Sequence, residues 1–225
     1  MVPLGMQRIV VLISGRGSNM QSLVLAARAQ SWPATICAVI SNQAQAAGLA
    51  WAGEQSIATE VVSHRAFAER EQFDRALAQA VERHRPDLVV LAGFMRVLGS
   101  AFVQQFAGRL INIHPSLLPA FKGLNTHARA LAEGVKIHGA TVHLVSPQLD
   151  GGVILAQAAV PVLADDNEQA LAARVLAAEH KLYPMVVQWI VSGQMRLGIE
   201  QARFASAVSP PAQGLWSAAV PSAEH

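Results

Sequence analysis

Two polar side chains lie close together at the end of an apolar run that extends from Leu110 to His114. Asn112 and His114 are two residues apart, and residues two apart on a β-strand point to the same face. An amide that both donates and accepts hydrogen bonds therefore shares a space with an imidazole that titrates near neutral pH. This pair is suited to acyl chemistry. The alternative is a histidine at a strand end that only bonds a nearby carbonyl group.

An acidic residue that could complete the pair follows in the glycine-rich turn 148–152. A carboxylate at Asp150 beside the imidazole would favour its protonated form and fix its orientation. Imidazolium and amide together could stabilise the oxyanion that develops when an amine attacks a carbonyl or formyl carbon. The sequence contains no Gly-x-Ser-x-Gly elbow, and its single cysteine lies in a distant element. We therefore predict direct transfer between two bound substrates.

Zinc binding is a competing interpretation of the same region. Several histidines and Asp150 could ligate zinc in principle, but neither a His-Glu-x-x-His motif nor a paired cysteine spacing occurs. We therefore predict a site without a metal. The histidines in question are His114, His127, His138 and His143.

The elements that position these groups begin with a strand pattern at Gln7–Ile13, a glycine loop at 14–19 and a helical pattern at 20–27. Strand, glycine loop and helix present backbone N–H groups and the positive end of a helix dipole to an anion. The loop lacks the third glycine of a dinucleotide fingerprint and the Lys-Ser/Thr of a P-loop. A tight turn with Ser18 or Asn19 as N-cap is the alternative.

Strands and helices continue to alternate along the chain. The strand at 86–92 is apolar on both faces, which is typical of parallel strands covered by helices. The alternation predicts an α/β fold with a Rossmann-like, doubly wound, mostly parallel sheet, whose ligands lie beyond the carboxyl ends of the strands. The other predicted strands are 34–40 and 58–62, and the predicted helices are 44–54, 67–84 and 100–106.

The loop 93–98 follows the strand at 86–92 and mixes Met95, Arg96 and Val97. It could line a flat apolar pocket with one charged group at its mouth. Ordinary core packing, with Arg96 extending to solvent, is the alternative. In a doubly wound sheet this loop, the glycine loop and His114 would lie at one edge.

The C-terminal part of the chain has a different pattern. Strands at 138–145 and 153–162 are joined by the glycine-rich turn, so this portion of the sheet is predicted to be mixed or antiparallel. The acidic run 165–168 predicts the start of a long helix, and a last strand is expected at 195–199. We expect a single domain over residues 7–200 and an irregular, proline-containing tail over 205–225.

Composition argues against several classes of partner. No apolar run approaches the roughly 20 residues of a membrane span, and the first residues lack a secretory signal pattern. The formal net charge is +2 and the basic residues are scattered, whereas nucleic-acid binders concentrate them. Cys37 is the only cysteine, so a reducing compartment is expected. We predict a cytoplasmic protein with neither membrane nor nucleic acid as partner.

Four segments in this order closely resemble the phosphoribosylglycinamide formyltransferases, folate-dependent enzymes of purine biosynthesis. The resemblance extends from about residue 8 to residue 197 and implies transfer of a formyl group from the co-substrate 10-formyltetrahydrofolate to the amino group of glycinamide ribonucleotide. A monomer or homodimer is expected. The segments are Ser-Gly-Arg-Gly-Ser-Asn at 14–19, Leu-Ala-Gly-Phe-Met-Arg at 91–96, Asn-Ile-His-Pro-Ser-Leu-Leu-Pro at 112–119 and Leu-Asp-Gly-Gly at 149–152.

The resemblance also implies a role for individual residues. Asn112 would hold the formyl oxygen, His114 would stabilise it and relay a proton, and Asp150 would keep His114 charged and help accept the amine proton through water. The residues that match ribonucleotide contacts are Gly17, Ser18, Asn19 and Glu179. The residues that match folate contacts are Arg70, Met95, Arg96, Val97, Leu98 and Asn112.

Related enzymes that share the trio leave alternatives open. Methionyl-tRNA formyltransferases add a second domain, and formyltetrahydrofolate deformylases add an N-terminal one. The continuation Gly-Leu-x-Thr-His at 123–127 favours the glycinamide enzyme, although Asn125 and Val153 depart from residues common in that family. Hydrolysis of formyltetrahydrofolate and non-catalytic binding of folate or nucleotide are the alternative functions. His143 could support the catalytic residues from behind, and we favour the alternative of a strand histidine with satisfied hydrogen bonds.

Overall fold

A computed structural model describes residues 6–199, 201–205 and 215–217. Within these residues an eight-stranded sheet has the order β10-β7-β6-β5-β4-β1-β2-β3, and β8 pairs with β9. The strands are β1 Gln7–Ile13, β2 Ala34–Ser41, β3 Ala58–Val61, β4 Leu88–Leu91, β5 Leu110–His114, β6 Ile137–Leu144, β7 Ile154–Pro161, β8 Met195–Leu197, β9 Ala202–Phe204 and β10 Leu215–Ser217. The helices are α1 Ser18–Ala29, α2 Ala47–Glu54, α3 Arg70–Arg83, α4 Ser100–Gln105, α5 Thr126–Ala132 and α6 Glu168–Val191, with a 3₁₀ turn η1 at His64–Ala66.

The sheet is parallel from β3 to β5 and antiparallel where β6 pairs with β5 and β7. This confirms the predicted doubly wound, mostly parallel sheet with an antiparallel C-terminal portion. Helices return the chain between the parallel strands from β1 to β5. The segment with α5 then leads into β6, which runs antiparallel to β5, and the short turn after β6 reverses the chain into β7. The carboxyl ends of β1, β4 and β5 therefore lie side by side.

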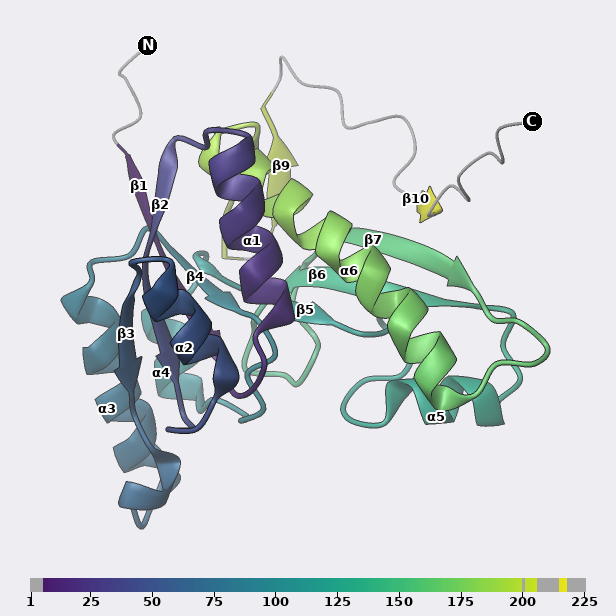
Figure 1. The fold of residues 1–225 in the computed structure, drawn as a ribbon, viewed down its shortest axis with the longest axis horizontal. Helices are drawn as coiled ribbons and strands as arrows, with labels where there is room; N and C mark the ends of the chain where they lie inside the picture. Colours follow the sequence, from purple (N-terminus) through teal and green to yellow (C-terminus); the bar gives the residue numbers. More distant parts are fainter. Residues whose placement is uncertain (1–5, 200, 206–214, 218–225) are drawn as a thin grey trace.

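Helices cover both faces of the sheet (Figure 1). Side chains alternate along β1, so Ile9 and Val11 pack in the core beneath α1, α2 and α6, while Val10 and Leu12 pack in the core beneath α3 and α4. All four are at most 1% exposed. The helix α1 also packs against α6, which brings residues far apart in the sequence together.

Several element bounds differ from the sequence prediction. The helix expected from residue 67 begins at Arg70, because Phe67 is extended and packs against Phe73 after the turn η1. The helix expected from residue 44 begins at Ala47. No helix in the described part of the chain is both long and apolar enough to cross a membrane.

Short strands lie near the C-terminal end of the described residues. The strand β9 pairs antiparallel with β8, and the domain bounds 7–200 stay a prediction. The strand β10, in the tail predicted to be irregular, pairs parallel with β7. An edge strand presents unpaired N–H and C=O groups, and Trp216 favours extended structure. The remaining tail residues, 206–214 and 218–225, lie outside the described residues.

Candidate active site

The end of β5 brings together the three residues predicted to act in catalysis. Asn112 and His114 project from β5, and Asp150 lies in the turn between β6 and β7 with a positive φ of 47°. His114 Nδ1 lies 3.5 Å from Asp150 Oδ2. Asn112 Nδ2 lies 3.2 Å from His143 Nε2, which in turn is 3.9 Å from Asp150 Oδ1. The four side chains form one connected polar cluster.

Hydrogen bonds orient the imidazole of His114, whose residue is 6% exposed. Its Nε2 lies 2.9 Å from the Phe121 carbonyl oxygen, so Nε2 carries the hydrogen in the neutral form and donates it. Nδ1 then faces Asp150 and can take up a proton. Asp150 Oδ2 is held by the Gly123 backbone N–H, which donates to it across 2.8 Å. An imidazolium at His114 would be stabilised by this carboxylate.

His143 is a strand histidine with both ring nitrogens bonded, as expected, and one of its partners is Asn112. Its Nδ1 donates to the Leu144 carbonyl oxygen across 2.8 Å, so the neutral ring presents Nε2 as an acceptor to the Asn112 amide. Burial lowers the pKa of His143, which favours this neutral form. The Asn112 amide nitrogen is thereby turned toward His143, and one of its two N–H groups remains for a ligand. His143 is the direct neighbour of Asn112 across the β5–β6 pair. The sequence could have indicated this contact only if the register of the two strands had been known.

The glycine loop 14–19 leads into α1 as predicted, but its cap differs. Gly17 is the N-cap, with a φ of 70°, so neither Ser18 nor Asn19 caps the helix. Only glycine adopts this left-handed conformation without a steric cost, and a Cβ here would also lie 3.1 Å from Met20 Cε. Ser18 is instead the first residue of α1.

Asn19 and Glu179, two of the residues predicted to bind the ribonucleotide, meet where α1 packs on α6. Asn19 Nδ2 donates to Glu179 Oε2 across 2.7 Å. Asn19 Oδ1 is buried and has no hydrogen-bond partner in the described part of the chain. Burial raises the pKa of Glu179 to about 7, while the bond from Asn19 acts in the opposite direction. The pair is a buried polar site with unused hydrogen-bonding capacity.

The structure divides the predicted folate contacts into two groups. Met95 and Val97 are 74% and 60% exposed at the carboxyl end of β4, whereas Leu98 is buried in the core. Arg96 does not simply extend to solvent, because its guanidinium lies 5.5 Å from the ring centroid of Phe73. Arg70 lies at the start of α3, and its Nε is 3.7 Å from Asp74 Oδ2. Apolar and cationic groups therefore border the strand ends, while Leu98 supports them from below.

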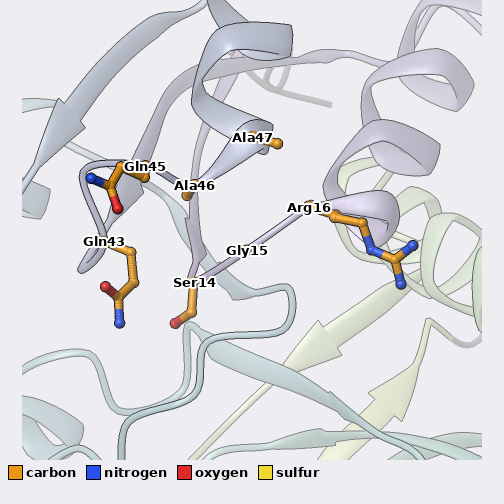
Figure 2. Close-up of a pocket in the computed structure, with 7 residues that line it drawn as sticks. All are labelled: Ser14, Gly15, Arg16, Gln43, Gln45, Ala46 and Ala47. Atoms are coloured by element: carbon orange, nitrogen blue, oxygen red, sulfur yellow. The ribbon is translucent and has the colours of Figure 1, made fainter.

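A hollow of about 320 Å³ lies beyond the carboxyl ends of β1 and β2, beside the glycine loop (Figure 2). It lies apart from the Asn112, His114 and Asp150 trio, none of which lines it. The described residues contain no group of three or more His, Cys, Asp or Glu side chains arranged to hold a metal ion. The lining residues are Ser14, Gly15, Arg16, Gln43, Gln45, Ala46 and Ala47.

Comparisons with known proteins agree with this geometry. Residues 7–187 match the family described as formyl transferase. The phosphoribosylglycinamide formyltransferase of Escherichia coli is 47% identical over 206 residues, which cover 92% of this chain and 97% of that protein.

Solved structures show the same relationship. The phosphoribosylglycinamide formyltransferase of Coxiella burnetii is 42% identical with a TM-score of 0.85, over 94% of this chain and 99% of the other. The one from Brucella melitensis is 50% identical with a TM-score of 0.79, over 86% of this chain and 100% of the other. A match of this extent in both sequence and structure shows that the chain belongs to the formyl transferase family, among its phosphoribosylglycinamide formyltransferases.

Proposed function

We propose that the protein transfers the formyl group of 10-formyltetrahydrofolate to the amino group of glycinamide ribonucleotide. The observation that carries this proposal is the polar cluster at the end of β5, in which His114 Nδ1 lies 3.5 Å from Asp150. The formyl folate supplies the electrophilic carbon, and the ribonucleotide supplies the amine. The chain itself needs to provide no nucleophile, and its residues are suited to stabilising charge.

Asn112 and His114 would stabilise the negative charge that develops on the formyl oxygen. Asn112 has one amide N–H not used by His143. The Nε2 hydrogen of His114 is directed at the Phe121 carbonyl oxygen, an acceptor of the same type as a formyl oxygen. The formyl oxygen would replace this carbonyl as acceptor. Asp150 would stabilise the imidazolium and accept a proton of the amine through a water molecule.

The two substrates would bind on either side of this cluster. Residues Gly17 and Ser18 of the glycine loop and the Asn19–Glu179 pair would hold the ribonucleotide, with its phosphate at the N-terminus of α1. The exposed apolar side chains of Met95 and Val97, with the cations at Arg70 and Arg96, would hold the folate. This arrangement fits a flat ring system that ends in a negatively charged tail.

One assay tests the function. Purified protein is mixed with 10-formyltetrahydrofolate, and release of tetrahydrofolate is followed with and without glycinamide ribonucleotide. Release only in the presence of the ribonucleotide supports the transferase. Release that does not depend on the ribonucleotide would identify a hydrolase, and absence of release would identify a non-catalytic binder.

The Asp150→Asn variant tests the role of the carboxylate in the same assay. Asparagine keeps the size of the side chain and an acceptor for the Gly123 N–H, but it removes the negative charge beside His114. We expect kcat to fall about 10²-fold or more, because a general base and its charge are lost together. Folate affinity should change little. If the variant is as active as the wild type, Asp150 has no part in catalysis and only shapes the turn.

The oligomeric state and the location remain predictions from the sequence. We propose a monomer or homodimer in the cytoplasm, which agrees with the free thiol of Cys37. Light scattering across a tenfold range of protein concentration would distinguish the two oligomeric states.

A further inference from the structure

The loop 93–99 combines exposed apolar side chains with a backbone tied to other elements. Met95 and Val97 are 74% and 60% exposed, an unusual degree for such residues in a segment between two core elements, β4 and α4. If the loop were not held by other elements, burying these apolar side chains would lower its free energy. Two polar residues outside the loop bond its backbone, one near each end.

The first tie is Ser14, at the carboxyl end of β1. Its hydroxyl accepts a hydrogen bond from the Met95 backbone N–H across 2.8 Å and donates one to Asn42 Oδ1 across 2.6 Å. Asn42 is 2% exposed, and its amide nitrogen lies 3.2 Å from His64 Nδ1. Figure 2 shows the Ser14 hydroxyl pointing away from Ala47. One hydroxyl therefore links the start of the loop to a buried network beyond β2.

The second tie is Asp74, on α3. Its Oδ2 accepts a hydrogen bond from the Gly99 backbone N–H across 2.7 Å, and the residue is 5% exposed. A Cβ added at Gly99 would lie 2.7 Å from the same oxygen. A side chain at position 99 would therefore have to displace the Asp74 carboxylate. Arg70 Nε lies 3.7 Å from this oxygen. The end of the loop is thus fixed by a buried carboxylate.

We propose that Ser14 and Asp74 are positioning residues that hold the loop 93–99 open as a preformed wall for the folate co-substrate. The inference rests on the proposed function, because it assigns the wall to that ligand. Neither residue contacts Asn112, His114 or Asp150 through any hydrogen bond or ion pair in the described part of the chain. Both ties act on the backbone, so they order the loop before the ligand arrives and reduce the entropic cost of binding.

Steady-state kinetics of Ser14→Ala and Asp74→Ala test the proposal. Each variant should raise the KM for 10-formyltetrahydrofolate about fivefold, as expected for loss of one ordered hydrogen bond, and leave kcat within about twofold. Ser14→Thr and Asp74→Asn retain the accepting oxygen and should recover most of the affinity. Ser192→Ala removes a hydroxyl at the far end of α6 and serves as the matched control. A fall in kcat with an unchanged KM would overturn the proposal.

Gly99→Ala keeps Asp74 intact and tests the second tie from the loop side. Its Cβ should displace the carboxylate and raise the KM for the folate as Asp74→Ala does. Thermal unfolding of every variant identifies those that remain folded, and the comparison is made among these. An unchanged KM in folded Gly99→Ala would contradict the role of Asp74.

Binding of tetrahydrofolate, the reaction product, separates failure of this proposal from failure of the function. Calorimetry needs no formyl transfer, so it reports on the wall alone. Weaker binding by Ser14→Ala and Asp74→Ala than by the wild type supports the proposal. Equal binding by wild type and variants would overturn it and leave the function standing. Absence of binding by the wild type would overturn the proposed function itself.

Discussion

At the scale of single residues, the candidate site depends on which atoms of each side chain are already bonded. His143 is the clearest case, because its Nδ1 is bonded to the Leu144 carbonyl oxygen and only Nε2 remains for Asn112. Asn112 therefore cannot rotate its amide without losing a hydrogen bond in a half-buried position. Under the proposed function, this strand histidine would fix the donor that faces the substrate.

The His143→Ala variant tests this assignment. Without the imidazole, the Asn112 amide loses its fixed orientation, and we expect kcat to fall about 10- to 100-fold, somewhat less than after removal of an oxyanion donor itself. The KM for glycinamide ribonucleotide should change little. His143→Gln can present an amide oxygen to the Asn112 N–H group and should recover part of kcat. Equal kcat in the wild type and His143→Ala would show that Asn112 needs no partner.

At the scale of elements, the contact between α1 and α6 should make the stability of the fold depend on pH, because it buries Glu179. Burial raises the pKa of Glu179 from 4.5 to about 7, so the folded protein binds a proton more tightly there than the unfolded chain. The tighter proton binding at Glu179 therefore stabilises the folded state. This stabilisation is complete below pH 4.5 and is lost as the pH rises through about 7. Above that pH the fold contains a buried negative charge whose one hydrogen bond comes from Asn19.

Glu179→Gln should remove the loss of stability at high pH, because glutamine still accepts the hydrogen bond from Asn19 but never carries the negative charge. We expect the variant to be more stable than the wild type at pH 8.5, by up to about 3 kcal/mol, and nearly equal to it at pH 4. Urea unfolding at the two pH values measures the difference. A stability difference that is the same at both would show that Glu179 does not titrate in this range.

The loops at the strand ends could be predicted only in part. The exposed Met95 and Val97 agree with the interpretation of 93–98 as a pocket wall, while the buried Leu98 agrees with core packing, so both alternatives describe some of the loop. Gly17 displaced both N-caps that the sequence suggested, since a left-handed residue can precede α1 without any side-chain cap. The edge strand β10 depends on a partner, β7, that its own three residues do not reveal.

At the scale of the whole molecule, buried and half-buried histidines should make the fold sensitive to acid. Burial lowers the pKa of His138 from 6.5 to about 4, and it also lowers the pKa values of His127, His143 and His180. Each neutral ring contributes stability above pH 6.5. This contribution is lost as the pH falls, for His138 through about 4, because the unfolded chain takes up the proton more readily.

His138→Phe tests this response. His138 is 1% exposed, both of its ring nitrogens lack a hydrogen-bond partner within the described residues, and its ring packs edge-on against Phe121 and His127. A phenyl ring can make the same contacts and cannot be protonated. Between pH 7.5 and pH 5 the Tm of the variant should fall less than that of the wild type. An equal fall would show that His138 does not contribute to acid sensitivity.

The sequence by itself determined the alternation of strands and helices and the loops at the carboxyl ends of β1 and β4, and it singled out Asn112, His114 and Asp150 as the predicted catalytic residues. These features follow from local patterns, since side-chain alternation, glycine positions and short motifs involve residues close in the chain. The tertiary structure alone decided that His143 faces Asn112, that Asn19 meets Glu179, and that Ser14 and Asp74 bond the backbone of the loop 93–99. Such contacts depend on strand register and helix packing between segments up to 160 residues apart. No local preference specifies them, because they arise from the core as a whole.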